Sequence, residues 1–436
     1  MEARGANTGG DRTDVLAIGF GTTVAMWTVG YICRVPPALA PSWLLLLLLC
    51  GCMVAGGFVA GRRTPHSWRG GLYAGIVSSV LNLLILGSLL TGSSPNRVVP
   101  SALWWIPGSI LVAAVLGVVG ADMAGRFNRG RIRRIDGAAA FAKVAVAATF
   151  LLLVVGGLVT SKRAGLAVVD WPNSFGYSMF LYPLSRMTGG IYYEHAHRLF
   201  GSLVGLTTAV LVLLLQKGDE RRWLRRLALI ALLTVVAQGL LGGLRVTGRF
   251  TTSQSPADTA PNIFLAIVHG VLGQVCFAMI VSIAVFMSTT WRGNATATAR
   301  PSVSTDRSLS VLLVALLILQ LVLGAIQRHL AGGLMIHITM AMFVFVLALA
   351  CGIRAWGMYK EQPRLQQAGK MLTHGVITQV VLGIGAMIFK GIEKDSLEPS
   401  ALSVMVRTMH QAMGAFLLAG ATLLMLWTRR LVKPAA

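Results

Sequence analysis

Long apolar stretches separated by short polar segments dominate the pattern along the chain. Stretches of at least 18 residues without Asp, Glu, Lys or Arg occur twelve times: 15–33, 35–61, 70–96, 98–121, 144–161, 199–216, 227–244, 259–291, 308–327, 329–353, 371–389 and 408–428. A helix needs about 20 apolar residues to cross the hydrocarbon core of a bilayer. Most stretches fit one crossing, and none is clearly long enough for two. The pattern predicts an all-α, polytopic transmembrane helix bundle with about twelve helices.

Composition and charge narrow the class of protein further. Of the 436 residues, 55% are hydrophobic and 12% are charged, which is roughly half the charged share of a soluble protein. This composition excludes a soluble enzyme, a secreted disulfide scaffold and a disordered chain. The net charge of +23 would indicate nucleic acid in a soluble protein. Here the basic residues lie in short loops between apolar stretches, so no nucleic-acid partner is expected.

Clusters of Arg and Lys predict the orientation of the helices. They follow the second, fourth, sixth, tenth and twelfth apolar stretches, at 62–69, 126–134, 217–226, 354–370 and 429–433. Because cytoplasmic loops carry the excess of positive charge, both termini are expected in the cytoplasm. All five cysteines lie inside apolar stretches and none forms a C-x-x-C pair, so neither a disulfide framework nor a zinc site is expected.

Two polar segments divide the chain into three parts. The Arg-rich stretch closes a first region of four helices, 1–136. The segment 292–307 is polar and low in complexity, which predicts a flexible linker. It separates 137–300 from 301–436, with four helices in each. The core is therefore expected to contain eight helices in two four-helix halves.

These two halves repeat one another. The motif Gln-x-x-Leu-Gly occurs on three helices, at 238–242, 320–324 and 379–383, and Val-Gly-Gly at 155–157 takes its place on a fourth. Each following helix has a histidine with a small residue four positions later: His197/Gly201, His269/Gly273, His337/Ala341 and His410/Gly414. Internal duplication is a common plan in membrane proteins, with a site between the repeats.

The four repeated histidines are the strongest candidates for a functional site. With both termini inside, all four lie in the outer half of one bundle, where ionisable residues are costly and functional by default. Zinc prefers a tetrahedral set of mixed ligands, which one histidine on each of four helices fits poorly. Haem needs an axial histidine on one or both faces, and the small residue one turn away leaves room for the macrocycle. Two pairs, one in each half, imply two haem sites.

The motif Glu194-His195-Ala196-His197-Arg198 opens the helix of the first repeated histidine. Glu194, His197 and Arg198 share a face, because they stand at i, i+3 and i+4. In one interpretation Glu194 complements the helix dipole and pairs with Arg198. In the other it acts as an acid or base beside a haem-ligating imidazole. His195 faces about 100° away and is expected to be an interfacial polar residue.

From about residue 140 to the C-terminus, the chain resembles the haem A synthase family of cytochrome oxidase assembly. The resemblance rests on the loop from Gly165-Leu166 to Asp170-Trp171-Pro172, on Glu-x-x-His-Arg at 194–198, and on one histidine on every second helix of the two halves. It implies an integral, multi-pass oxidoreductase of a bacterial-type plasma membrane. Such an enzyme oxidises the C8 methyl of haem O to a formyl group, with water as the oxygen donor, and so forms haem A.

The resemblance also implies roles for single residues. His197 and His269 would hold the substrate haem O, His337 and His410 would be the axial ligands of a haem b cofactor, and Glu194 would be the catalytic carboxylate. Haem iron would be the metal at all four histidines. The implied partners are haem O, haem O synthase, oxidase assembly factors, membrane lipid and further copies of the chain.

Two features depart from the family pattern. The first outer loop after residue 140 has no cysteine pair, and His195 stands where tyrosine is common. The first four helices lie outside the resemblance altogether.

Two other functions remain open for this pattern. A dihaem, quinol-linked electron carrier similar to a cytochrome b would need the histidines but not Glu194. A proton-coupled transporter would use the repeats for alternating access and the histidines as proton relays. Bound haem would exclude the transporter, and haem A formation that depends on Glu194 would separate the enzyme from the carrier.

Overall fold

The computed structural model describes residues 8–36, 39–64, 67–85, 87, 91, 95–127, 135–247, 263–330, 332–394, 396 and 398–435. Within them the chain forms twelve long helices and one short one, α9 (Thr289–Arg292). The long helices are α1 (Thr8–Cys33), α2 (Ser42–Arg63), α3 (Ser67–Ile85), α4 (Ala102–Phe127), α5 (Gly137–Ser161), α6 (Gly189–Gly218), α7 (Arg222–Thr247), α8 (Ile263–Met287), α10 (Val303–Leu330), α11 (Leu334–Met358), α12 (Pro363–Ile392) and α13 (Ala401–Leu431). Eleven of the described helices are long and apolar enough to span a membrane.

The predicted all-α, polytopic bundle is therefore confirmed. Among the twelve long helices described, α3 is the one outside this set of eleven, and it carries the polar side chains of Arg69 and Asn82. The side of the membrane on which the termini lie stays a prediction. Residues 128–134 of the predicted basic cluster lie outside the described residues.

Short strands and turns complete the structure. Strands β1 (Asn173–Ser174) and β2 (Tyr177–Ser178) form an antiparallel hairpin, followed by the 3-10 helices η2 (Met179–Leu181) and η3 (Leu184–Arg186). Strand β3 (Thr298–Arg300) pairs in parallel with β4 (Val432–Pro434).

The β3–β4 pair corrects one prediction from the sequence. Strand β3 lies inside the segment 292–307, which was predicted to be a flexible linker. Arg300 in this strand also bonds Glu361 at 2.6 Å. The linker prediction is wrong for these residues, because a strand more than a hundred residues away satisfies their backbone hydrogen bonds.

The chain forms two compact units. Unit 1 contains residues 1–151 and 167–225, and unit 2 contains residues 152–166 and 226–436. Helices α1–α4 and α6 belong to unit 1, helices α8 and α10–α13 belong to unit 2, and α5 and α7 contribute to both. The three-part division of the chain predicted from its sequence stays a prediction.

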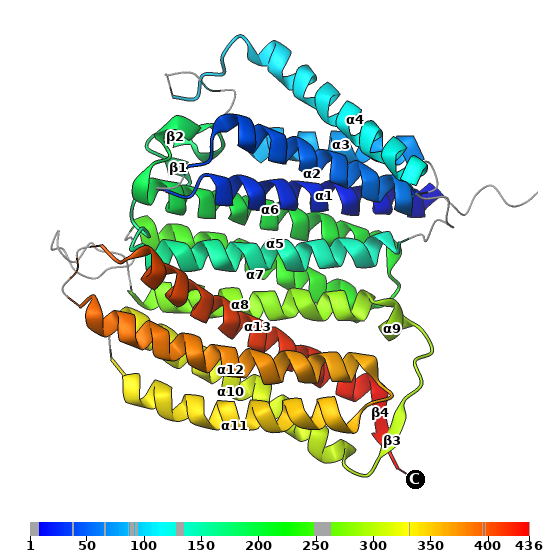
Figure 1. Ribbon diagram of the computed structural model, residues 1–436, viewed down its shortest axis with the longest axis vertical. Helices are drawn as coiled ribbons and strands as arrows, with labels where there is room; N and C mark the ends of the chain where they lie inside the picture. Colours follow the sequence, from blue (N-terminus) through cyan, green and yellow to red (C-terminus); the bar gives the residue numbers. More distant parts are fainter. Residues whose placement is uncertain are drawn as a thin grey trace, which may run out of the picture. The chain divides into compact units, whose positions relative to one another are not determined.

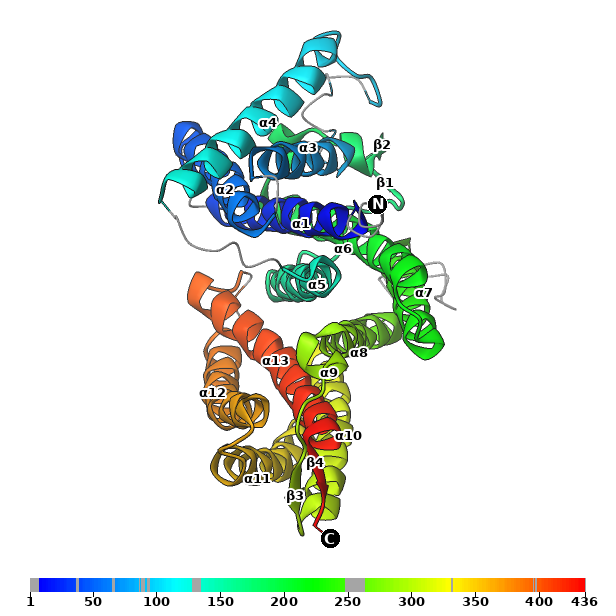
Figure 2. The same cartoon turned by 90° about the vertical axis from the view of Figure 1, so that its right-hand side faces the viewer.

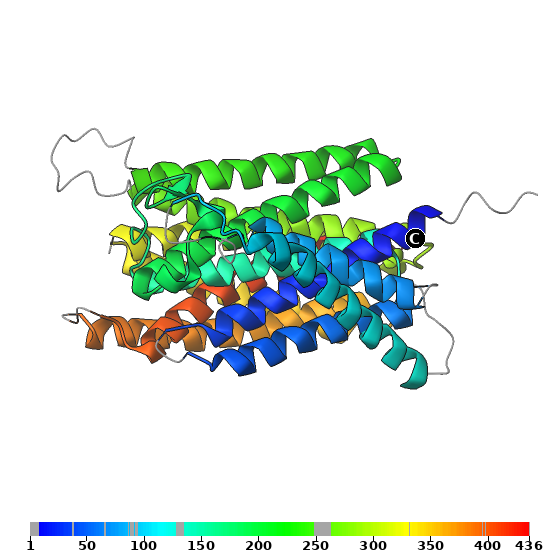
Figure 3. The same ribbon diagram turned by 90° about the horizontal axis from the view of Figure 1, so that it is seen from above.

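Glycines allow close helix packing in unit 1. Helices α2, α3 and α4 lie side by side (Figures 1 and 2), and α4 crosses α2 and α3 at an angle (Figure 3). An added Cβ at Gly57 or Gly71 would collide with the carbonyl of Gly117. Small residues of this kind let helix backbones approach closely inside a membrane. The abundance of glycine in the first four helices therefore has a packing role.

Unit 2 has an apolar core between α10, α11, α12 and α13, which lie together in Figure 1 (yellow to red). The core includes the buried side chains of Leu313, Leu317, Ala348, Leu372 and Leu417. A polar contact joins the start of α10 to the end of α11. Asp306 accepts hydrogen bonds from Arg354 at 2.9 Å and from the Tyr359 hydroxyl at 2.5 Å.

Candidate functional site

The α5–α6 loop, residues 162–188, folds around the carboxylate of Asp170. Asp170 Oδ1 accepts a hydrogen bond from the Phe175 N–H at 2.7 Å, and Oδ2 accepts one from the Gly176 N–H at 3.0 Å. Phe175 (φ 52°) and Gly176 (φ 77°) form the two-residue turn between β1 and β2. Positive φ at both central positions marks a type I′ hairpin, which favours glycine at the second. Asp170 of the Asp-Trp-Pro motif therefore closes the hairpin.

Arg198 ties this loop to α6. Its Nη1 donates to the carbonyls of Asp170 at 2.7 Å and Asn173 at 2.9 Å, and its Nη2 donates to that of Val168 at 2.8 Å. Its Nε lies 3.5 Å from Glu194 Oε1, and both side chains are 7% exposed. The ion pair predicted from the i,i+4 spacing is therefore formed, and it is buried. A chemical role for Glu194 stays a prediction.

His195 is buried, so the prediction of an interfacial residue is wrong. Its exposed fraction is 0%, and its Nδ1 lies 3.0 Å from the hydroxyl of Ser174, which is also fully buried. The Tyr182 ring lies 4.9 Å from the imidazole, and burial raises the pKa of Tyr182. The helical spacing indicated correctly that His195 faces away from Glu194. It did not show that the α5–α6 loop covers this face.

The first four helices also contact the Glu194 region. The Tyr192 hydroxyl donates to the carbonyl of Tyr31 at the end of α1, at 2.6 Å, and the two rings stack at 5.2 Å. Asn96, between α3 and α4, accepts a hydrogen bond from the Ser178 N–H at 2.7 Å. The region outside the resemblance thus holds both the start of α6 and the hairpin.

His197 lies half-buried on α6, one turn after Glu194. An added Cβ at Gly201, one turn further, would meet no atom within 4 Å. This is the room that the sequence predicts next to the histidine. His269, the predicted partner of His197, belongs to unit 2. Their pairing on one haem stays a prediction.

In unit 2, each Gln-x-x-Leu-Gly motif places its glycine against the histidine of the next helix. An added Cβ would lie 3.0–3.4 Å from the imidazole Cε1 in all three cases: Gly242 with His269, Gly324 with His337, and Gly383 with His410. Protein interiors are close-packed, so a side chain at any of these positions would press on the imidazole. The repeated glycine therefore sets the place of the histidine.

The glutamine of the motif contacts the same histidine in two of these cases. Gln320 Nε2 lies 3.1 Å from His337 Nδ1 and donates to the His337 carbonyl at 3.0 Å. Gln379 Nε2 lies 3.5 Å from His410 Nε2. Such neighbours orient the ring of a ligand histidine. Sequence reasoning found the motif but missed this role, because the glutamine and the histidine are on different helices.

His337 and His410 are close enough for their side chains to interact electrostatically. His410 Nδ1 is buried and has no hydrogen-bond partner among the described residues. An added Cβ at Gly414, one turn along α13, would lie 3.4 Å from Leu321 and 3.7 Å from Gln379. Neighbouring imidazoles and a small residue one turn away fit axial ligation of a haem.

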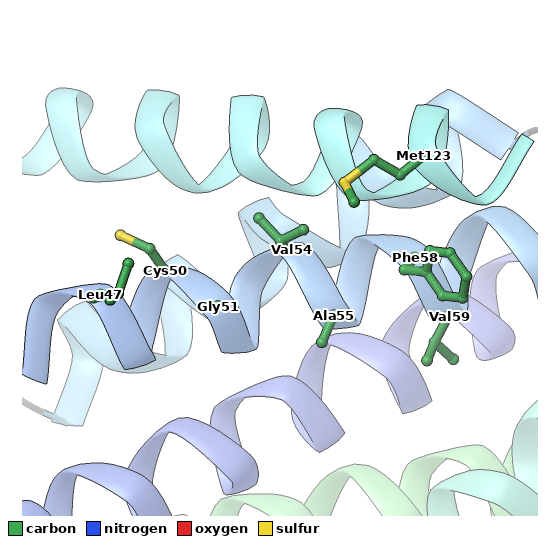
Figure 4. A pocket seen from close by; sticks show the side chains of 8 residues that line it. All are labelled: Leu47, Cys50, Gly51, Val54, Ala55, Phe58, Val59 and Met123. Carbon is green, nitrogen blue, oxygen red and sulfur yellow. The ribbon is translucent and has the colours of Figure 1, made fainter. Parts of the chain in front are cut away.

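An apolar groove between α2 and α4 is a separate feature of unit 1 (Figure 4). It is lined by Leu47, Cys50, Gly51, Val54, Ala55, Phe58, Val59 and Met123. These side chains provide no carboxylate, imidazole or cation.

These observations define a class of protein: a polytopic all-α membrane protein whose repeated helices present histidines against glycine motifs. The family model that matches the chain is COX15-CtaA, cytochrome oxidase assembly protein, over residues 178–337. The match includes Glu194, His197 and His269, ends at His337 and leaves out His410. Over these residues the chain is similar to this cytochrome oxidase assembly family, which confirms the predicted resemblance for that part of the chain. No curated protein matches the chain.

Proposed function

We propose that this protein is a haem A synthase-like membrane oxidoreductase that converts haem O to haem A. The C8 methyl becomes a formyl group, one water supplies the oxygen, and four electrons and four protons are released. The observation that carries the proposal is the buried Glu194–Arg198 pair beside His197, within the segment that matches the cytochrome oxidase assembly family.

The histidines have the binding roles in this proposal. His197 and His269 hold haem O, and His337 and His410 hold haem b as its axial ligands. Haem b, when bound, supplies a path for the electrons that leave the substrate. The contact between Gln320 and His337, together with the proximity of His337 to His410, supports the haem b site. Haem O synthase is the proposed source of the substrate, and oxidase assembly factors are the proposed recipients of haem A.

Glu194 is the proposed catalytic carboxylate. It shares a helix face with His197, so it is directed to the rim of a porphyrin held there. At that place its oxygens accept protons from the substrate or orient the attacking water, a contribution of about 10²–10⁴-fold. Arg198 keeps the carboxylate in position through its Nε. Its Nη1 hydrogen bond to the α5–α6 loop fixes the guanidinium itself.

The test is expression in a host that makes haem O but not haem A, followed by chromatography of the extracted haems. We expect haem A from the wild type. Glu194→Gln should keep its haems and fold, yet accumulate haem O or an alcohol intermediate. The matched control is Glu361→Gln, since Glu361 is an exposed carboxylate with an arginine partner of its own. It should give wild-type haem A.

The outcome separates the enzyme from the dihaem carrier. Near-wild-type haem A from well-folded Glu194→Gln would remove the carboxylate from the mechanism. A wild type that binds two haems but makes no haem A would favour the electron carrier. The carrier draws support from the Gln–His contacts of unit 2, which do not involve Glu194.

A further inference from the structure

Each of the two halves has an arginine shortly after one of its glutamine motifs. Arg245 lies in the last turn of α7, seven residues after Gln238, and Arg328 lies in the last turn of α10, eight residues after Gln320. At 1.5 Å per residue, each is about 10–12 Å beyond the glutamine of its motif. Each half thus has one cation beyond a glutamine motif.

Arg328 has neutral partners within the described residues. It donates from Nη1 to Gln411 Oε1 at 3.1 Å and from Nη2 to the Ser161 hydroxyl at 2.9 Å. Its charged neighbour is Arg407, a like charge, whose own guanidinium pairs with Glu393 at 3.2 Å. A cation at such a place in a membrane helix is costly without a counter-charge. The arrangement therefore calls for an anion.

The position of Arg328 points to the histidine pair. Gln411, which it binds, directly follows His410 on α13. Arg328 also acts electrostatically on His410. A ligand held by His410 and His337 is therefore within the electrostatic range of this guanidinium.

Arg245 has the same relation to His269. The two side chains interact electrostatically. The guanidinium packs on the backbone of the loop after α5, where an added Cβ at Gly165 would lie 2.7 Å from Arg245 Nη2. His329, next to Arg328, also interacts electrostatically with Arg245. Positive charge thus gathers beside the histidines of both halves.

We propose that Arg328 binds a propionate carboxylate of the porphyrin held by His337 and His410, and that Arg245 is a second such site beside His269. The inference rests on the proposed function, because haem is the bound group. Haem has an apolar ring with two carboxylates on one edge, so its site needs cations to one side of the axial ligands. The planar guanidinium binds a carboxylate through two parallel hydrogen bonds. A lipid phosphate shares this anionic chemistry.

The test compares haem with its dimethyl ester, which has the same ring and iron but no carboxylate charge. Both are titrated into the full-length protein in membranes from haem-deficient cells, and the low-spin bis-histidine spectrum is followed. A hydrogen bond between charged groups typically changes affinity by about 10- to 100-fold. We expect wild type to prefer haem by about this factor and Arg328→Gln to bind the two compounds almost equally.

Two variants serve as controls. Arg328→Lys keeps the charge without the planar fork and should retain part of the preference. Arg364→Gln removes an exposed arginine in the first turn of α12 and should keep the full preference. As a second measurement, the purified holoprotein of Arg328→Gln should lose haem to a scavenging apoprotein about 10- to 100-fold faster than wild type.

The possible outcomes separate this inference from the proposed function. An unchanged preference in Arg328→Gln would overturn the carboxylate site. A lipid phosphate would be assigned to the site if anionic lipid stabilised wild type but not Arg328→Gln, while both bound haem and its dimethyl ester with the same preference. That result would also overturn the carboxylate site. Absence of haem A formation in a haem-loaded wild type would contradict the enzyme but leave the ester comparison valid. A wild type that binds neither compound would overturn both.

Discussion

Replacing Arg198 with methionine should destabilise the protein much more than replacing Glu194 with glutamine. Arg198 donates three hydrogen bonds of 2.7–2.9 Å to loop carbonyls, and it faces Glu194 at 3.5 Å with both side chains 7% exposed. Arg198→Met removes the guanidinium that faces a buried carboxylate, which costs about 3–5 kcal/mol. Glu194→Gln leaves the three carbonyl bonds and an amide oxygen for Arg198, so we expect a loss of about 1–2 kcal/mol.

The double variant tests whether the losses of stability in the two single variants add. Arg198→Met combined with Glu194→Gln removes both charges of the pair. It should therefore be more stable than Arg198→Met alone, by about 1–2 kcal/mol. If the two side chains acted independently, the double variant would instead be the least stable of the three.

The free energy of unfolding would be measured in detergent by denaturant titration with far-ultraviolet circular dichroism. Limited proteolysis of the α5–α6 loop would show whether the loop detaches first. The matched control is Arg126→Met, which breaks an exposed i,i+4 pair with Asp122 at 2.7 Å and should cost less than about 1 kcal/mol. Equal losses in Glu194→Gln and Arg198→Met, or a double variant no better than Arg198→Met, would refute the reasoning.

Three further predictions concern other parts of the chain. Reporter fusions at Gly293 should report the cytoplasm and fusions at Ser174 the outside; an inside signal at Ser174 would contradict the orientation argued from the basic clusters. His337→Ala and His410→Ala should each remove the low-spin haem b spectrum, and a wild-type spectrum in both would place that haem elsewhere. Hydrogen bonds from the N-cap serine of α13 lower the pKa of Glu393, so its stabilising effect should be present at neutral pH and disappear as the pH falls below about 4. The unfolding midpoints of wild type and Glu393→Gln should therefore converge in acid, and a constant difference would contradict this.

Helix number and fold class followed from the sequence because a bilayer imposes a minimum length on each apolar segment. The repeat was equally visible, because the glutamine motif recurs on alternate helices and each following helix has a histidine with a small residue four positions later. The contact of Gly383 with His410, by contrast, depends on how two helices pack. Spacing along the chain does not contain that information. The motif could be read from the sequence, but the contact of its glycine with the histidine of the next helix could not.

Errors arose where distant segments meet. His195 was expected at the interface, and it is buried because the α5–α6 loop folds back over α6. Asp170 could be read only as part of a motif, since its two amide donors lie in a turn five and six residues later. Strand β3 was expected to be a flexible linker, and its partner strand lies at the far end of the sequence. Local pattern predicts helices well here and predicts loop contacts poorly.

The first four helices lie outside the resemblance, yet their contacts give them a role that can be tested. The amide of Asn96 bonds the hairpin through both of its polar atoms: Oδ1 accepts from the Ser178 N–H in β2 at 2.7 Å, and Nδ2 donates to the Gly176 carbonyl in the turn at 3.4 Å. Asn96 itself has a φ of 60°, which asparagine tolerates better than most residues. The side chain of Asn96 thus pairs with the hairpin backbone as a neighbouring strand would, and it belongs to the N-terminal region.

Loss of this clamp should loosen the hairpin without unfolding the helices. In Asn96→Ala, amide hydrogen exchange at residues 174–178 should become faster by about 5- to 30-fold, because one or two hydrogen bonds to the hairpin are gone. Exchange in α1–α4 should stay as in wild type. Ser109→Ala is the matched control, since the Ser109 hydroxyl donates to the Ile106 carbonyl within its own helix, α4; it should leave the hairpin unchanged. If exchange at 174–178 did not respond to Asn96→Ala, the N-terminal helices would not be supporting the loop that Arg198 holds over the start of α6.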